Sequence, residues 1–457
     1  GGKIQKNQST NTGNKGTADG AGIFTSGTFE MNGPSLIDAN YSERGYGGGV
    51  YVLYAASGSC TCTITGGTIS NNSSLCGGGI YVDTPDDVAM TNATIIGNTA
   101  RDGGWGGGIY VWRCGKLSTM TDMLISNNVA GTGGGVAINI GYGRLSGRPT
   151  LGSGVQVIDN AAKDAGGGIV VRICNEKSRE PVVIDGCTIS GNVAGAKSDR
   201  DYSGDGGGIV TYAGTWLKIK NTQITKNGTA KMIGDVEYSP VVYGGGIDME
   251  DSTCVEVESV TITGNEAYCG GGVSIGDCSI DSPESGMTSG KDTGEMVFTM
   301  KGGTISNNKA AYGGGVNIDH CATAGTFIMS DGAIITNNTA ERSGGGVYGE
   351  RASLFEMSDG VLNNNRAGYQ GDDIYSDATG TIHILDISQK GWELDGKDNR
   401  CTHDITGWFV DSAVRRWNST DDLETAFTTY TEVTGEQALK AAHNFVKVNV
   451  TANYTYT

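Results

Sequence analysis

Three carboxylates follow one of the chain's glycine triplets, in the stretch YGGGIDMED that ends at Asp251. Asp248 and Glu250 are two residues apart, so on a strand they point the same way with Cα atoms about 6.6 to 7 Å apart. Asp319 follows another triplet at the same offset as Glu250. Paired carboxyls about 5 to 5.5 Å apart hydrolyse glycosidic bonds with retention, and pairs about 6.5 to 9.5 Å apart with inversion. Asp248, Glu250 and Asp319 are therefore candidates for the acid and the nucleophile or base of a glycoside hydrolase, with either stereochemical outcome open.

The elements that position these carboxylates belong to a repeat. Glycine triplets recur along the chain, and the shortest intervals between them are 26 to 27 residues. Each triplet is followed by Ile or Val, at positions 50, 80, 109, 136, 169, 209, 247, 273, 316 and 347, with imperfect copies ending at Ile23 and Ile374. A second signature is an apolar residue, two variable residues and then Asn; it ends at Asn72, Asn98, Asn128, Asn160, Asn192, Asn227, Asn265, Asn308, Asn338 and Asn365, and Asn7 and Asn40 fit it as well.

This repeat predicts an all-β fold. A period of 20 to 50 residues indicates a solenoid, a propeller or a stacked array, and a propeller blade needs more residues than the shortest units hold. In a parallel β-helix each coil stacks on the last at about 4.8 Å, so equivalent residues form columns. Asn tolerates the turn conformation and can bond to the Asn one coil away, while Gly supplies positive φ at another corner. We predict a parallel β-helix of about 12 coils over residues 1–385, followed over 386–457 by a C-terminal cap or the start of a further module.

The triplet and the Asn signature resemble the polymorphic outer-membrane-type repeats of bacterial surface proteins, which pair a GG[AI] motif with an xxN motif. The resemblance covers roughly residues 1 to 380 and implies a right-handed, pectin-lyase-like β-helix that is secreted or displayed on a bacterial surface. More weakly, the pattern is similar to the β-helix lacto-N-biosidases, glycosidases that release a disaccharide with two Asp. Because such repeats build adhesins as well as polysaccharide-active enzymes, the resemblance implies fold more specifically than function.

The residues beside the carboxylates have the character of a sugar-binding site. After each triplet, the Ile or Val and the residue two later are expected to face the core, and the residues between them to face solvent. Aromatic rings stack on the C–H face of sugars while charged and amide groups bind hydroxyls. We predict substrate contacts along this exposed face from Trp112, Asn139, Arg172, Tyr212, Asp277, His320 and Glu350. Insertions at about 193–205, 229–242 and 279–296 are expected to wall the same stretch.

Other interpretations of the acidic residues stay open. Acidic side chains on an exposed strand face are often only solvated, and no cofactor is then needed. Calcium is a further alternative, because Asp248, Glu250, Asp251 and Asp277 form an oxygen-rich group. At the level of function, the alternatives to a hydrolase are an adhesin that binds glycan or protein on the same face, and a passive stalk.

Composition narrows the partners. The net charge of −18 argues against nucleic acid and anionic membranes, and no apolar run of about 18 residues predicts a membrane span. The eleven cysteines include no CxxC spacing; Cys278 and Cys321 share one offset, which permits either a bridge or simple packing. The opening GGKIQKN looks like the middle of a repeat, so we expect an upstream segment in the native chain.

Overall fold

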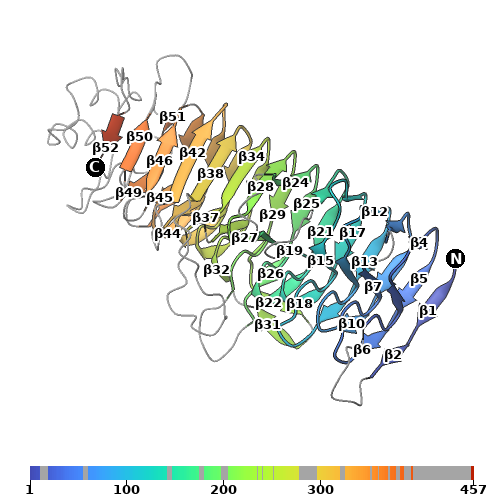
Figure 1. Ribbon diagram of the computed structural model, residues 1–457. Coiled ribbons are helices and arrows are strands. Elements are labelled where there is room, and N and C mark those ends of the chain that lie inside the picture. Colours follow the sequence, from blue (N-terminus) through green and yellow to red (C-terminus); the bar gives the residue numbers. More distant parts are fainter. Residues whose placement is uncertain are drawn as a thin grey trace, which may run out of the picture. The chain divides into compact units, whose positions relative to one another are not determined.

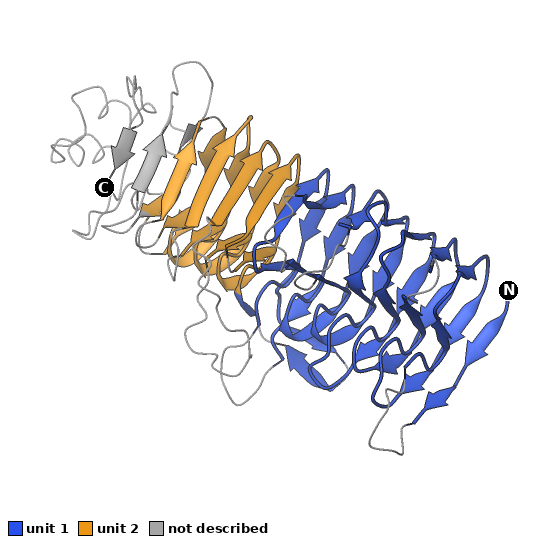
Figure 2. Cartoon of the chain, in the orientation of Figure 1, with its two compact units in different colours: residues 1–242 blue, residues 243–457 orange. Residues whose placement is uncertain are grey.

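The computed structural model describes the chain except for residues 11–18, 55–59, 141–146, 174–179, 197–203, 234, 239, 251, 277–295, 320–324, 350–352, 359, 369–370, 377–380, 385–392, 395–453 and 457. The described residues form strands, turns and irregular segments but no helix (Figure 1). Consistent with this, a search of them for a helix long and apolar enough to cross a membrane finds none. The chain divides into two compact units, residues 1–242 and 243–457, which are described separately below (Figure 2).

The first unit contains four parallel sheets, named A to D, and each sheet is built from every fourth strand of the chain. Sheet A comprises β1 (Lys3–Gln5), β5 (Leu36–Asp38), β9 (Thr68–Ser70), β13 (Thr94–Ile96), β17 (Leu124–Ser126), β21 (Gln156–Ile158), β25 (Thr188–Ser190) and β29 (Gln223–Thr225). Sheet B comprises β2 (Gln8–Ser9), β6 (Tyr41–Ser42), β10 (Ser73–Ser74), β14 (Thr99–Ala100), β18 (Val129–Thr132), β22 (Ala161–Ala165) and β26 (Val193–Ala194). Sheet C comprises β3 (Ile23–Thr25), β7 (Val50–Leu53), β11 (Ile80–Asp83), β15 (Ile109–Arg113), β19 (Val136–Ile140), β23 (Ile169–Ile173) and β27 (Ile209–Tyr212). Sheet D comprises β4 (Phe29–Met31), β8 (Cys62–Ile64), β12 (Val88–Thr91), β16 (Thr119–Thr121), β20 (Thr150–Leu151), β24 (Val182–Asp185) and β28 (Trp216–Lys220).

The second unit repeats this arrangement with strands of the same four kinds. Its A strands are β35 (Thr261–Thr263), β39 (Thr304–Ser306), β43 (Ile334–Thr336), β47 (Val361–Asn363) and β51 (Glu393–Leu394). Its B strands are β36 (Ala267–Cys269), β40 (Lys309–Tyr312), β44 (Thr339–Ser343) and β48 (Arg366–Ala367). Its C strands are β33 (Ile247–Met249), β37 (Val273–Ile275), β41 (Val316–Ile318), β45 (Val347–Gly349) and β49 (Ile374–Ser376). Its D strands are β34 (Cys254–Glu258), β38 (Met296–Lys301), β42 (Gly325–Ser330), β46 (Leu354–Met357) and β50 (Thr381–Ile384), and β52 (Tyr454–Tyr456) pairs with β50 antiparallel.

Within each unit the chain visits four sheets in turn and then returns to pair in parallel with the strand one repeat earlier. The prediction of an all-β chain with stacked parallel strands is therefore confirmed, and the arrangement is compatible with a β-helix or solenoid. The predicted cap falls largely on 395–453, outside the described residues. Of the expected insertions, 229–242 forms a hairpin of β30 (Lys231–Ile233) and β31 (Val236–Tyr238) before β32 (Val241–Tyr243).

The Asn signature forms the predicted row at one corner of the repeat. In both units the Nδ2 atom of each Asn donates to Oδ1 of the Asn one repeat later, at 2.8 to 3.0 Å. Most of these side chains are completely buried. In the second unit the row ends on a carboxylate, because Asn365 donates to Oδ1 of Asp373 at 2.9 Å. Buried amides are thus satisfied by their own copies, which fixes how successive repeats stack.

The glycine triplets form another corner, and their first and third positions need Gly for different reasons. The first Gly has positive φ; at Gly106, φ is +68°, and a Cβ there would lie 2.7 Å from Cβ of Tyr110. The third Gly packs against the next repeat; a Cβ on Gly79 would lie 2.6 Å from the carbonyl oxygen of Gly108. Any side chain here would push neighbouring repeats apart, so the triplet permits the stacking on which sheet C depends.

Candidate functional site

The C strands carry the candidate residues, and their register in the first unit confirms part of the predicted column. Asn139 on β19 pairs with Arg172 on β23, which in turn pairs with Tyr212 on β27. Trp112 is not aligned with Asp83 of the preceding repeat. A bulge between β11 and β15 aligns Asp83 with Arg113, whose Nε donates to Oδ1 of Asp83 at 2.9 Å.

The C-strand face was predicted to be exposed, and this prediction is wrong for most of its described residues. Tyr51, Tyr81 and Tyr110 each directly follow the Ile or Val after a triplet, and each is only 5 to 7% exposed. The residues before the triplets cover them: the rings of Tyr46 and Tyr81 stack with centroids 4.9 Å apart, and Trp105 also packs on this cluster. The positive-φ glycine that begins each triplet turns the preceding residue back over the strand, which explains the burial.

The predicted sugar-binding residues of the first unit lie within or beside this covered layer. Asn139 is buried and its Nδ2 donates to the hydroxyl of Tyr110 at 3.2 Å. Tyr212 is buried in a cluster with Val170 and Val210. Trp112 and Arg172 are half-buried, and Nε of Arg172 is a buried donor without a hydrogen-bond partner. Along the described C strands of the first unit, these residues are therefore packed among other side chains.

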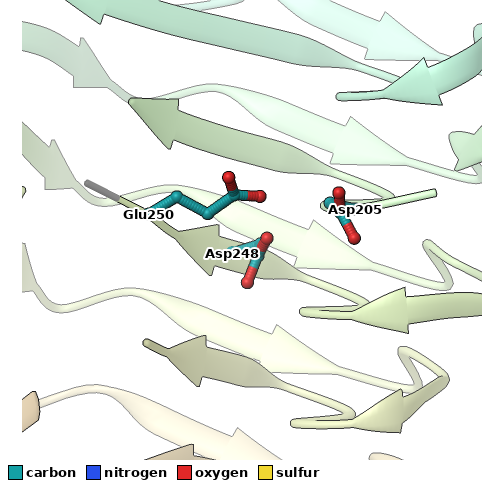
Figure 3. Close-up of side chains that lie close together, drawn as sticks. All are labelled: Asp205, Asp248 and Glu250. Carbon is teal, nitrogen blue, oxygen red and sulfur yellow. The ribbon is translucent and has the colours of Figure 1, made fainter. Parts of the chain in front are cut away.

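In the second unit the structure brings Asp248 and Glu250 together. Asp248 lies on β33 and is completely buried, while Glu250 follows the strand and is half-buried. A carboxylate oxygen of one lies within 4.8 Å of a carboxylate oxygen of the other. Figure 3 shows the two side chains. It also labels Asp205, a residue of the first unit that forms an isolated β-bridge with Ala165.

Asp319 lies close to a glycine on the neighbouring strand, Gly276. Gly276 continues the register of β37 after Ile275, and its N–H donates to the carbonyl of Met249 at 3.2 Å. A Cβ on Gly276 would lie 2.7 Å from Cβ of Asp319, so Gly is needed for the close approach of this buried carboxylate. The structure thus places Asp319 on the same strand series as the carboxylate pair, two C strands further on.

Two polar residues that sequence reasoning did not single out complete the site. Ser274 pairs with Asp248, and Asn317 pairs with Ser274, so the three side chains share one face of adjacent strands. Ser274 and Asn317 are 0% and 1% exposed, yet Oγ of Ser274 and Nδ2 of Asn317 have no hydrogen-bond partner. Their signal in the sequence is position alone: each occupies the place directly after the Ile or Val, in the column that begins with Asp248.

The same column continues onto tyrosines. Asn317 pairs with Tyr348, and Tyr348 with Tyr375, whose rings stack with centroids 5.0 Å apart and planes 5° apart. The ring of Tyr312 lies 5.2 Å from that of Tyr348 and 5.9 Å from that of Tyr268, which is 38% exposed. We call Tyr268, Tyr312, Tyr348 and Tyr375 the tyrosine stripe. Tyr375 follows the imperfect triplet GDDI at the offset of Tyr348, which is how the sequence marks it.

Several predicted site residues lie outside the described residues: Asp251, Asp277, His320 and Glu350, and with them Cys278 and Cys321. Of the four residues suggested as calcium ligands, only Asp248 and Glu250 therefore lie among the described residues.

Chemically, the second unit presents a carboxylate pair, a row of buried hydrogen-bonding groups and a set of partly exposed aromatic rings. Such a combination can position polyols and transfer a proton. Comparison of the chain with family models, with curated proteins and with solved structures gives no match.

Proposed function

We propose that the protein is a secreted or cell-surface glycoside hydrolase that acts on host or dietary glycans, with Asp248 and Glu250 as its carboxylate pair. The observation that carries this proposal is the approach of their carboxylate oxygens to within 4.8 Å. Retaining glycosidases hold their two carboxyls about 5 to 5.5 Å apart, whereas inverting ones leave room for a water between them. The separation favours retention.

The burial of the two side chains assigns their roles. Asp248, which is completely buried, is the nucleophile, and the half-buried Glu250 is the acid and base that water can reach. Glu250 protonates the glycosidic oxygen while the Asp248 carboxylate attacks the anomeric carbon, so the C–O bond breaks and the alcohol leaves. Glu250 then takes a proton from water, which displaces Asp248 and frees the sugar. Asp319 is the remaining candidate carboxylate, close to this pair on the same strand series.

The finer fold assignment is part of the proposal. We infer a right-handed parallel β-helix of the pectin-lyase type with about 12 coils, because the Asn row and the triplets repeat in register within each unit. The repeat's resemblance to bacterial surface β-helices supports an extracellular location. The weaker resemblance to lacto-N-biosidases makes milk and mucin oligosaccharides the first substrates to test.

The proposal is tested by screening the protein against mucin, milk and plant oligosaccharides, with product sugars separated by liquid chromatography. Glu250→Gln and Asp248→Asn are expected to lower turnover by about 10²–10⁴-fold or more, because each keeps the side chain's shape and removes its acid–base chemistry. Asp331→Asn is the matched control, since Asp331 is an exposed turn residue with positive φ, which Asn tolerates. Turnover that survives in both site variants and in Asp319→Asn would exclude the carboxylate mechanism.

The mechanism assigns no role to a metal, which separates it from the calcium alternative. Turnover in the presence of a chelator should equal turnover in added calcium. Loss of activity on chelation, with recovery on calcium addition, would favour a cation held by Asp248 and Glu250.

A second candidate function is glycan or protein binding without chemistry, as in an adhesin. The specific observation in its favour is the complete burial of Asp248 together with the partial exposure of the tyrosine stripe. Under this alternative the protein retains bound oligosaccharide and releases no product. The same chromatographic screen, combined with a glycan array, distinguishes the two functions.

A further inference from the structure

Five side chains of the second unit form one continuous row across neighbouring strands. Asp248, Ser274, Asn317, Tyr348 and Tyr375 are successive register partners on β33, β37, β41, β45 and β49. Neighbouring strands are about 4.8 Å apart, so the row is about 19 Å long. It runs perpendicular to the strands, and its first member belongs to the carboxylate pair.

The first part of the row has unmet hydrogen-bonding capacity. Oγ of Ser274 and Nδ2 of Asn317 are buried without partners, which costs free energy in the protein alone. A hydroxyl group both donates and accepts, so a polyol is able to satisfy a serine hydroxyl and an amide donor together. The unmet donors therefore indicate a polar ligand beside Asp248 rather than an apolar one.

The second part of the row presents aromatic surface. The stacked rings of Tyr348 and Tyr375 are both partly exposed, and Tyr312 extends the surface sideways. Above the ring of Tyr312, the guanidinium carbon of Arg342 lies 5.3 Å from the centroid. Flat aromatic faces next to hydrogen-bonding groups match a sugar chain, whose rings have a C–H face and a hydroxyl edge.

We propose that this row binds one extended oligosaccharide, laid across the strands from Asp248 to Tyr375. The sugar next to the carboxylate pair takes its hydrogen bonds from Ser274 and Asn317, and later sugars stack on Tyr348 and Tyr375. The inference rests on the proposed function in placing the reaction at the Asp248 end of the row. It concerns binding, however, and binding is measured without turnover. The substrate class is accordingly a chain long enough to span the row, not a single sugar or a disaccharide.

The test uses oligosaccharides of increasing length, taken from whichever glycan of the screen binds, starting with milk, xylan and β-glucan oligosaccharides. Their affinity for the full chain carrying Glu250→Gln is measured by titration calorimetry. Affinity is expected to rise with length until the chain spans the row. Tyr348→Ala should weaken the longest chain by about tenfold and leave disaccharides unchanged, whereas Tyr348→Phe, which keeps the ring, should bind like the parent.

A matched control is Tyr54→Ala, which removes a partly exposed first-unit ring outside this row and should not change affinity. Affinity that does not depend on length, or an equal effect of Tyr348→Ala on short and long chains, would overturn the inference. Binding of a peptide in place of every oligosaccharide would overturn it as well. Length-dependent binding without turnover keeps the inference and removes the hydrolase, while turnover without length dependence does the reverse.

Discussion

Asn128 and Asn160 are joined by a hydrogen bond from Nδ2 of the first to Oδ1 of the second at 3.0 Å, across neighbouring repeats. Asn128 Nδ2 also donates to the carbonyl of Ile95 at 3.0 Å. Its Oδ1 accepts from the backbone N–H and from Nδ2 of Asn98. One buried side chain therefore connects three successive repeats, and its loss leaves the backbone N–H of Asn98 without its acceptor.

Asn128→Ala is expected to destabilise the first unit by several kcal/mol. Each buried donor or acceptor left without a partner costs about 1–3 kcal/mol. This substitution removes the acceptor of the Asn98 backbone N–H, and it removes one donor each from the Ile95 carbonyl and from Oδ1 of Asn160. The measurement is the midpoint of thermal or denaturant unfolding. Thr119→Ala, at an exposed strand position, is the control and should stay within about 0.5 kcal/mol of the parent. Equal midpoints for the two variants would show that the Asn row does not hold the repeats together.

Alanine at the third triplet position should be as damaging as the loss of an Asn. The Cβ of Gly79→Ala would lie 2.6 Å from the backbone oxygen of Gly108, so neighbouring repeats must shift. At Gly27 a Cβ meets nothing within 4 Å, and Gly27→Ala is the control. We expect a lower unfolding midpoint, or no soluble protein, for Gly79→Ala alone. If Gly79→Ala expresses and melts like Gly27→Ala, the close packing of the triplets is refuted.

The register of the second unit was predictable because each C strand begins at a fixed offset from its triplet. The Ile or Val after the third Gly is buried in every complete triplet copy, so it fixes which residues lie side by side. This places Asp248, Ser274, Asn317 and Tyr348 in one column without knowledge of the structure. The Asn row was predictable for the same reason, since an amide is satisfied by its own copy.

Two features of the first unit were not predictable from this spacing. A bulge before Asp83 aligns Asp83 with Arg113 instead of Trp112, and the spacing from the triplets does not reveal it. Burial of the aromatic column depends on Tyr46 and Trp105, which precede triplets and fold back over the strands. Alternation along a strand predicts which way a side chain points, but not whether another side chain covers it.

Alkaline pH should destabilise the first unit through its buried tyrosines. Burial raises the pKa of Tyr51, Tyr81 and Tyr110 well above the usual value of about 10. Above pH 10 the unfolded chain loses these protons while the native state keeps them. The contribution of the three tyrosines to the free energy of unfolding is therefore complete below about pH 10 and is lost as the pH rises above it. Unfolding midpoints measured between about pH 9 and 11 should fall, and Tyr81→Phe should flatten the decline. An unchanged slope in that variant would mean that Tyr81 ionises in the folded protein.

Thiol burial gives a related expectation at slightly lower pH. Desolvation raises the pKa of Cys62 and of Cys187 to about 12 in each case, against about 8.5 for a free thiol. Both thiols stay protonated in the folded protein but ionise in the unfolded chain above about pH 8.5. Their contribution to the free energy of unfolding is therefore lost as the pH rises above that value. Alkylation by iodoacetamide near pH 8.5 should spare Cys62 and Cys187 until the protein unfolds. Modification of either under native conditions, mapped by peptide mass spectrometry, would contradict their burial.

Ser274→Ala should stabilise the protein while weakening its ligand. Oγ of Ser274 is buried beside Asp248 without a hydrogen-bond partner, and burying such a group costs about 1–3 kcal/mol. Alanine removes the hydroxyl without leaving a large cavity, so the unfolding midpoint should rise although a polar contact for sugar is lost. A stabilising change that impairs binding is the behaviour expected of a residue retained for function. A lower midpoint would instead mean that the hydroxyl has a partner in the free protein. The unmet hydrogen bond of Ser274 would then no longer support polyol binding along the row from Asp248 to Tyr375.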